Sequence, residues 1–251
     1  MENILYSEIE SKRFDAIIYR CKTNNFDIDV LIDSIKKNMI DVLILRLPTN
    51  TKSEHNKLLS LPYPVLHADS LVYYKCDLSK IENNKILRDD LSFVVLKKDK
   101  YDTIKNIIPI IFQNYQNHYF SNPIFDKDKI TAGYTEWALS FLVDPKKICW
   151  SIVNATKKVV AIACCSFYLE QNICEINLAG TVPEFSRQGV YSFLIKQIQL
   201  FLINNNYENI LISTQLQNVA VQKNWIREGF NMVYSYDTYH INSKLGHLKS
   251  K

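Results

Sequence analysis

Glycine, long apolar runs and closely paired cysteines are all scarce in this sequence. Only five of its 251 residues are glycine, so each glycine that interrupts a segment is conspicuous. No run approaches the roughly eighteen apolar residues that a spanning helix needs, and the acidic start Met1-Glu2-Asn3 lacks the regions of a signal peptide. The sequence therefore predicts no membrane helix and no secretory leader, and we expect a cytoplasmic protein without a membrane partner.

The cysteines and the charges exclude two further classes. Six cysteines are present without Cys-x-x-Cys spacing, and several fall in apolar runs, which is typical of buried reduced thiols rather than a metal site. The formal charge of +4 is spread along the chain, and its cationic residues cluster only in the tail. We therefore expect neither a metal nor a nucleic-acid partner.

The apolar content and the length predict a folded chain of two lobes. An apolar fraction of 47% excludes disorder as a description of the whole chain. A charged stretch over 97–102 marks the expected boundary between the lobes. We predict an α/β lobe over 1–98, a second domain over 101–242 and a frayed tail over 243–251.

Hydrophobic periodicity predicts the secondary structure of each lobe. In the first, strands are expected at 14–21, 41–47, 65–76 and 91–96, with helices at 28–37 and 52–61. In the second lobe, a helix from Ile104 with a kink at Pro109 is followed by a helix at 128–141. An antiparallel meander is expected next, with strands at 148–153, 159–168 and 173–182. The order then continues as helix, strand, helix and a last strand that ends at His240.

A turn around Gly189 carries the strongest functional signal. An apolar run ends at Val182, Pro183 follows, and apolar residues recur at helical spacing from Val190. The backbone N–H groups of 187–191 would then be unpaired donors at a helix N-terminus, where the helix dipole favours a phosphate. Gly189 permits close approach of a ligand, and Arg187 adds a charge. Many α/β proteins carry such a turn for structural reasons alone.

A second pattern downstream identifies a family resemblance. Asn218, Val221, Trp225, Gly229 and Phe230 follow the strand expected at 210–214. With the turn, this order resembles the GNAT superfamily of acyl-CoA-dependent N-acyltransferases, whose patterns read Arg/Gln-x-x-Gly-x-Gly/Ala and Asn-x-x-Ala-x-x-x-Tyr-x-x-x-Gly-Phe. The sequence departs from these patterns at Ser186, Tyr191, Val221 and Trp225.

The turn and three further segments resemble one branch of that superfamily. The similarity is to bacterial dTDP-amino-deoxysugar N-acyltransferases. It lies in the Gly-Val-Tyr-Ser turn, in residues 213–218 and 234–240, and in the stretch 118–137 with its Tyr134-x-x-Trp137 pair. The resemblance covers roughly 100–241. It implies an α/β (α+β) class, with a GNAT fold around a mixed central sheet and a smaller N-terminal lobe that is a candidate partial GNAT-like half.

The resemblance implies a set of acyl-CoA contacts with no metal. The pantetheine arm would bind along the strand edge, and the pyrophosphate would bind at the turn. The cofactor-binding residues that the resemblance implies are Gly180, Thr181, Val182, Arg187, Gln188, Gly189, Val190, Tyr191, Asn218 and Trp225. Asn218 also suits a helix N-cap. Trp225 stands where many relatives carry a tyrosine acid, and because an indole N–H is no usable acid, packing is its expected role.

Candidate catalytic and acceptor residues are less sharply defined. A base is needed to deprotonate the amine, and His240 and Glu136 are candidates with Tyr239 behind them. His118, Tyr119, Tyr134 and Trp137 are expected to bind the acceptor, although aromatic residues also anchor helices to sheets.

These expectations combine into one predicted reaction and its rivals. The chain would transfer an acetyl or short hydroxyacyl group, such as 3-hydroxybutyryl, from acyl-CoA to a dTDP-linked amino-deoxysugar for surface-glycan synthesis, and a homodimer is the expected assembly. The alternatives are acylation of a protein, polyamine or aminoglycoside amine, which would favour an acidic cleft not evident in 115–145, and a non-catalytic acyl-CoA-binding module.

Overall fold

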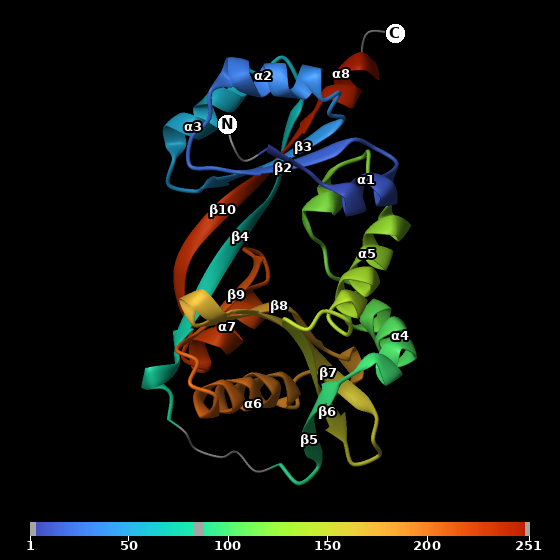
Figure 1. Ribbon diagram of the computed structural model, residues 1–251, viewed down its shortest axis with the longest axis vertical. Coiled ribbons are helices and arrows are strands. Elements are labelled where there is room, and N and C mark those ends of the chain that lie inside the picture. The colour runs from blue at the N-terminus through green and yellow to red at the C-terminus, as the bar shows by residue number, and fades with distance from the viewer. Residues whose placement is uncertain (1–3, 83–87, 249–251) are drawn as a thin grey trace. The chain divides into compact units, whose positions relative to one another are not determined.

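The computed structural model describes residues 4–82 and 88–248 and divides into two compact units (Figure 1). Unit 1 comprises residues 1–72, 116–130 and 234–251, and unit 2 comprises 73–115 and 131–233. Each unit contains helices and strands of a mixed sheet, so the predicted α/β class is confirmed. Among the described helices, none has the length and apolar content to cross a membrane.

Unit 1 is built on strands β1, β2, β3, β10 and β4, in that order across its sheet. Strand β2 pairs parallel with β3, and β10 pairs antiparallel with β3 from Tyr236↔Pro48 to Asn242↔Val42. The strand bounds are β1 (Ile4–Tyr6), β2 (Ile18–Lys22), β3 (Val42–Pro48), β4 (Val65–Asp77) and β10 (Asn231–Asn242), and the helix bounds are α1 (Glu8–Phe14), α2 (Ile28–Lys37), α3 (Lys52–Lys57) and α8 (Ser243–Leu248).

The helices of unit 1 follow from local sequence. Asp27 caps α2, because its carboxylate accepts a hydrogen bond from the Val30 backbone N–H at 3.0 Å. Leu31 and Ile35, four residues apart, lie on the buried face of α2. They join an apolar cluster with Leu43, Leu45 and Leu47 of β3. The alternate residues Val42 and Ile44 belong to a second cluster, so both faces of β3 are covered, which accounts for its uninterrupted apolar run.

Unit 2 is built on the remainder of β4 with β9, β8, β7, β6 and β5, in that order across its sheet. The strand bounds are β5 (Leu91–Leu96), β6 (Lys147–Asn154), β7 (Val159–Tyr168), β8 (Ile173–Thr181) and β9 (Asn209–Gln215), and the helix bounds are α4 (Tyr101–Phe112), α5 (Lys127–Ser140), α6 (Val190–Asn204) and α7 (Val219–Arg227). Strands β6, β7 and β8 form the predicted antiparallel meander. Strand β5 pairs antiparallel with β6, and β8 pairs parallel with β9.

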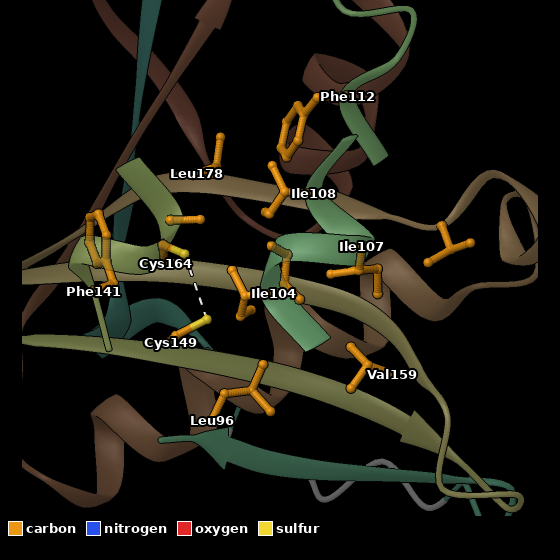
Figure 2. Packing of buried hydrophobic residues seen from close by; sticks show 13 residues of the cluster. Leu96, Ile104, Ile107, Ile108, Phe112, Phe141, Cys149, Val159, Cys164 and Leu178 are labelled. Atoms are coloured by element: carbon orange, nitrogen blue, oxygen red, sulfur yellow. Dashed lines mark hydrogen bonds between the residues drawn. The ribbon is translucent and has the colours of Figure 1, made fainter. Parts of the chain in front are cut away.

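Helices α4 and α6 cover opposite faces of the unit 2 sheet. Neighbouring residues of a strand point to opposite faces; Cys149 of β6 joins the apolar cluster of α4, whereas Trp150 contacts Phe201 of α6 with ring centroids 5.1 Å apart. Figure 2 shows Ile104, Ile108 and Phe112 of α4 packed over the sheet, with the Cys149 and Cys164 sulfurs 3.6 Å apart. All six cysteines are buried and free, as predicted.

Three sequence-based boundaries need correction. Residues from Tyr73 to Leu96 belong to unit 2, and 234–242 belong to unit 1 because β10 completes the β3 edge, so a single boundary near 98–101 is wrong. Phe14 ends α1 rather than beginning a strand. The tail expected to fray forms α8 over Ser243–Leu248, and residues 249–251 lie outside the described residues.

Candidate functional site

The centre of the site is a point in unit 2 where two parallel strands separate. Strands β8 and β9 pair only from Ile173 to Ile176 and from Asn209 to Ile212. A register shift against Cys164 and Cys165 of β7 leaves Asn177 as the extra residue of a β-bulge at this point. Beyond it the last residues of β8 have no β9 partner, which opens a strand edge for a ligand.

The backbone groups at this edge belong to Ala179 and Thr181. The Val182 N–H donates to the Val160 carbonyl at 2.9 Å, and because backbone groups alternate along a strand, Gly180 is also directed toward β7. Ala179 and Thr181 therefore present their N–H and C=O groups on the side away from β7. Of the predicted pantetheine contacts Gly180, Thr181 and Val182, only Thr181 therefore has its backbone groups on this edge.

Two buried side-chain oxygens on β8 lack hydrogen bonds. Asn177 Oδ1 and Thr181 Oγ1 have no partner among the residues that the structure describes. Buried polar atoms are nearly always hydrogen-bonded, so an unpaired one suggests a missing ligand or water. Both residues lie at the bulge or on the unpaired part of β8, where the predicted pantetheine contact of Thr181 would fall.

The turn that follows β8 has the geometry of an anion site. Arg187 (φ 61°) and Gly189 (φ 74°) both have left-handed backbones, and α6 begins immediately afterwards. Its first bond runs from the Phe193 N–H to the Gly189 carbonyl at 2.9 Å, and Gly189, at the N-cap position, has no side chain that could cap the helix. The first-turn N–H groups from Val190 onward therefore lack intrahelical acceptors. The Val190 side chain is buried, so only its backbone faces the turn.

Arg88 is a residue of the site that the sequence did not reveal. Its Nη1 atom donates to the Gln188 carbonyl at 3.2 Å, and it lies 3.6 Å from the position that a Cβ at residue 189 would occupy. Its guanidinium also pairs with Asp90 at 2.7 Å. No spacing or motif connects residues a hundred positions apart, so only the fold could identify this second cation beside Arg187.

Asn218 occupies the N-cap position of α7 but its side chain bonds elsewhere. No side-chain cap bond forms, and Nδ2 donates to Thr214 Oγ1 of β9 at 3.0 Å. The same Thr214 hydroxyl lies 3.3 Å from Tyr115 Oη, which also bonds to Gln215. These polar side chains gather at the end of β9, beside its unpaired segment.

Trp225 is hydrogen-bonded to Tyr191. It is 2% exposed, and its indole Nε1 donates to Tyr191 Oη at 3.0 Å. Its ring also meets Tyr74 edge-on at 5.4 Å between centroids. Burial raises the pKa of the Tyr191 phenol, which stays protonated at neutral pH. Two of the four departures from the family pattern, Tyr191 and Trp225, thus form one bonded pair.

The predicted acceptor residues are divided between the units. Tyr134 of α5 stacks on Phe112 with centroids 5.0 Å apart and packs against the unit 2 core. Trp137 is 43% exposed and neighbouring Glu136 is exposed. His118 and Tyr119 lie in unit 1, where Tyr119 bonds to Glu10 and Arg20.

His240 and Tyr239, two of the predicted catalytic residues, also lie in unit 1. His240 is 0% exposed, with Nε2 at 2.8 Å from His118 Nδ1 and Nδ1 at 3.0 Å from Asn122 Nδ2. Burial lowers its pKa to about 3, so it is a weak base with both nitrogens occupied. Tyr239 Oη bonds to His55 Nδ1 at 2.8 Å. These contacts indicate structural roles for both residues, and Glu136 alone shares unit 2 with the turn.

Several solved structures have the same fold and match nearly the whole length of this chain. A GCN5-related N-acetyltransferase from Sphaerobacter thermophilus matches with a TM-score of 0.66 at 8% identity, over 95% of this chain and 75% of that one. A GCN5-related N-acetyltransferase from Kribbella flavida gives 0.58 at 11% identity, over 92% and 84%. A functionally unknown conserved protein from Staphylococcus epidermidis ATCC 12228 gives 0.64 at 13% identity, over 96% and 92%.

Comparison of the sequence with family models and with curated proteins gives no match. At identities this low the structural similarity establishes the fold, and the GNAT-like architecture predicted from the turn and the downstream helix is confirmed. It does not extend to the amino-sugar branch.

Proposed function

We propose that unit 2 binds acyl-CoA and transfers its acyl group to an amine. The observation that carries this proposal is the continuity between the β8 edge, which opens where β9 separates, and the N-terminus of α6 that follows it, whose N-cap is a glycine. Pantetheine would bond to the free backbone of Ala179 and Thr181, and pyrophosphate to the N–H groups after Gly189. Arg187 and Arg88 would add charge-assisted contacts.

The reaction needs a hydrogen-bond donor to the developing oxyanion, an acceptor for the amine proton and a sulfur leaving group that can depart. A backbone N–H of the β8 edge would stabilise the developing oxyanion, an effect of about 3 kcal/mol for single donors elsewhere. A CoA thiol, with an ordinary pKa near 8.5, leaves tolerably well as a thiolate without a dedicated acid. We propose Glu136 or solvent as the acceptor of the amine proton, because His240 and Tyr239 are engaged in unit 1.

The acyl group proposed is acetyl. Ala179 and Gly180 are small residues, and small side chains here would leave room beside the thioester for a longer acyl chain. A Cβ at Gly180 would lie 2.3 Å from Ile111 Cγ2 of α4, so this space is filled by a core side chain. This contact does not affect Ala179, so the short hydroxyacyl group stays as the alternative to acetyl.

The acceptor proposed is the amine of a dTDP-linked amino-deoxysugar in the cytoplasmic stage of surface-glycan synthesis. Support comes from the sequence resemblance and from Trp137, an exposed ring on α5 that could stack on a base or sugar. The rival acceptors are polyamine, aminoglycoside and protein amines, and the remaining alternative is a module that binds acyl-CoA without chemistry.

Thiol release separates these possibilities. The protein would be incubated with acetyl-CoA and, in parallel, with dTDP-amino sugars, spermidine, an aminoglycoside and an amino-terminal peptide. Release that depends on a dTDP-amino sugar supports the proposal, and release with only another amine would reassign the acceptor. Tight acetyl-CoA binding without release for any amine would support the non-catalytic module.

A further inference from the structure

One face of the unit 1 sheet carries an apolar cluster at one end of its strands and polar and cationic side chains further along. The register places Lys22 beside Arg46 and Arg46 beside Thr238, so these side chains form one row across β2, β3 and β10. One row earlier, Ile44 belongs to the apolar cluster beneath α1 and 119–130. That cluster does not include the row of Arg46.

Two members of this row carry buried polar atoms without partners. Arg46 Nε and Thr238 Oγ1 make no hydrogen bond within 4–82 and 88–248, and Thr238 is 0% exposed. Within the same ranges Arg46 forms no ion pair either. A buried donor left unpaired destabilises a fold, and a guanidinium more so, which suggests an absent ligand.

The neighbouring acid is already occupied. Glu10 accepts hydrogen bonds from Arg20, one of them from Nη2 at 2.6 Å, and from Tyr119. Burial opposes ionisation of this carboxyl, but the bonds from Arg20 hold its pKa below the usual value. Glu10 therefore neutralises Arg20, and among the described residues no carboxylate pairs with Arg46.

The histidines on this face add a neutral donor. Asn122 Nδ2 donates to Asn242 Oδ1 at 2.8 Å and to His240 Nδ1, so the His240 proton resides on Nε2 and is donated to His118 Nδ1. The remaining proton of His118 is then on Nε2. Burial, followed by the charges of nearby groups that include Arg46, lowers the pKa of His118. The ring is thus a hydrogen-bond donor without positive charge.

We propose that this row of unit 1 binds an oxyanion, the phosphoryl or carboxylate group of a small molecule, between the Arg46 guanidinium and the Thr238 hydroxyl. Paired residues on adjacent antiparallel strands have Cβ atoms about 5 Å apart, so a single group with two acceptor oxygens can bond to both donors. The arginine fork favours such a group over a halide. This site is separate from the acyl-CoA site of unit 2 and does not rest on the function proposed for it.

Arginine Nε–H resonances of the full chain give a direct test. The Arg46 signal in a ¹H–¹⁵N spectrum is assigned by its loss in Arg46→Met, and the protein is titrated with inorganic phosphate and with acetate at constant ionic strength. We expect a saturable shift with one of them, and that anion identifies the group. In Thr238→Val, which keeps the side-chain shape, the apparent affinity should fall at least tenfold.

Matched variants exclude a general salt effect. Lys37→Met removes a charge from the exposed last turn of α2 and should titrate like the wild type. The saturating anion should raise the Tm of the wild type and of Lys37→Met, but not that of Arg46→Met. A shift that grows linearly with both anions, or equal affinity in Thr238→Val, would overturn the proposal.

Discussion

Buried histidines make unit 1 sensitive to acid. The pKa of His240 is lowered to about 3 by burial, against 6.5 in the unfolded chain, and burial lowers the pKa of His118 as well. Because the folded value lies below the unfolded one, protonation favours unfolding. The stability contribution is therefore complete above pH 6.5 and is lost as the pH falls from 6.5 toward 3.

We predict that His240→Gln reduces this sensitivity. A glutamine can accept from Asn122 and donate to His118, but it does not titrate. Between pH 7 and pH 5 the free energy of unfolding of the wild type should fall by about 2 kcal/mol more than that of the variant. Urea unfolding at the two pH values measures the difference. Equal losses in both proteins would show that His240 is not buried and neutral.

Trp225 is expected to act through packing and one hydrogen bond. In Trp225→Phe the Tyr191 hydroxyl loses its indole donor, which should cost about 1 kcal/mol and leave most of the turnover. Trp225→Ala should cost about 3–5 kcal/mol because a large buried ring is lost. Urea unfolding and thiol release are measured on both variants. A hundredfold loss of turnover in the phenylalanine variant at near-normal stability would assign the indole a catalytic role.

At the scale of elements, the contact of α4 with β8 explains Gly180. A Cβ at this position would lie 2.3 Å from Ile111 Cγ2, so Gly180→Ala should destabilise the protein by about 1–3 kcal/mol through overpacking. Ile111→Ala removes the clashing methyl group. A double-mutant cycle by urea unfolding should therefore show a smaller loss for Gly180→Ala in the Ile111→Ala background. Additive losses would mean that the two residues do not touch.

The two aromatic residues of α5 should respond differently to truncation. Tyr134 stacks on Phe112 in the core, whereas Trp137 is 43% exposed. Tyr134→Ala should lower stability, and Trp137→Ala should raise the KM for the acceptor while stability and acetyl-CoA affinity stay near normal. Steady-state kinetics with thermal unfolding distinguish them. A Trp137→Ala variant with unchanged acceptor KM would remove this residue from the acceptor site.

Local patterns predicted most elements because each depends on nearby residues. The strand at Leu91–Leu96 and the helix after Gly189 follow from apolar periodicity and a glycine turn. The sequence could not show that β10 pairs with β3, or that Arg88 reaches Gln188, because these contacts join segments far apart in the chain. For the same reason His240 was a plausible base in sequence, and only its burial against His118 and Asn122 indicated otherwise.

At the scale of the whole molecule, each unit carries its own polar centre. Unit 2 combines an open strand edge with a helix N-terminus whose N-cap is a glycine. In unit 1, Arg46 Nε and Thr238 Oγ1 bond to no residue that the structure describes. The two proposals concern different units and are independent. Arg46→Met should therefore leave acetyl-CoA affinity unchanged. The acyl-CoA site is the central claim, and it depends on the left-handed turn at Gly189.

Calorimetric titration of acetyl-CoA into the wild type and Gly189→Val tests that claim most directly. A β-branched residue is strained at φ 74° and places its side chain over the turn, so affinity should fall tenfold or more. Asn172→Val introduces the same kind of strain at φ 52° where β8 begins and should bind like the wild type. Unchanged affinity in a folded Gly189→Val protein, or no binding by the wild type, would contradict the account.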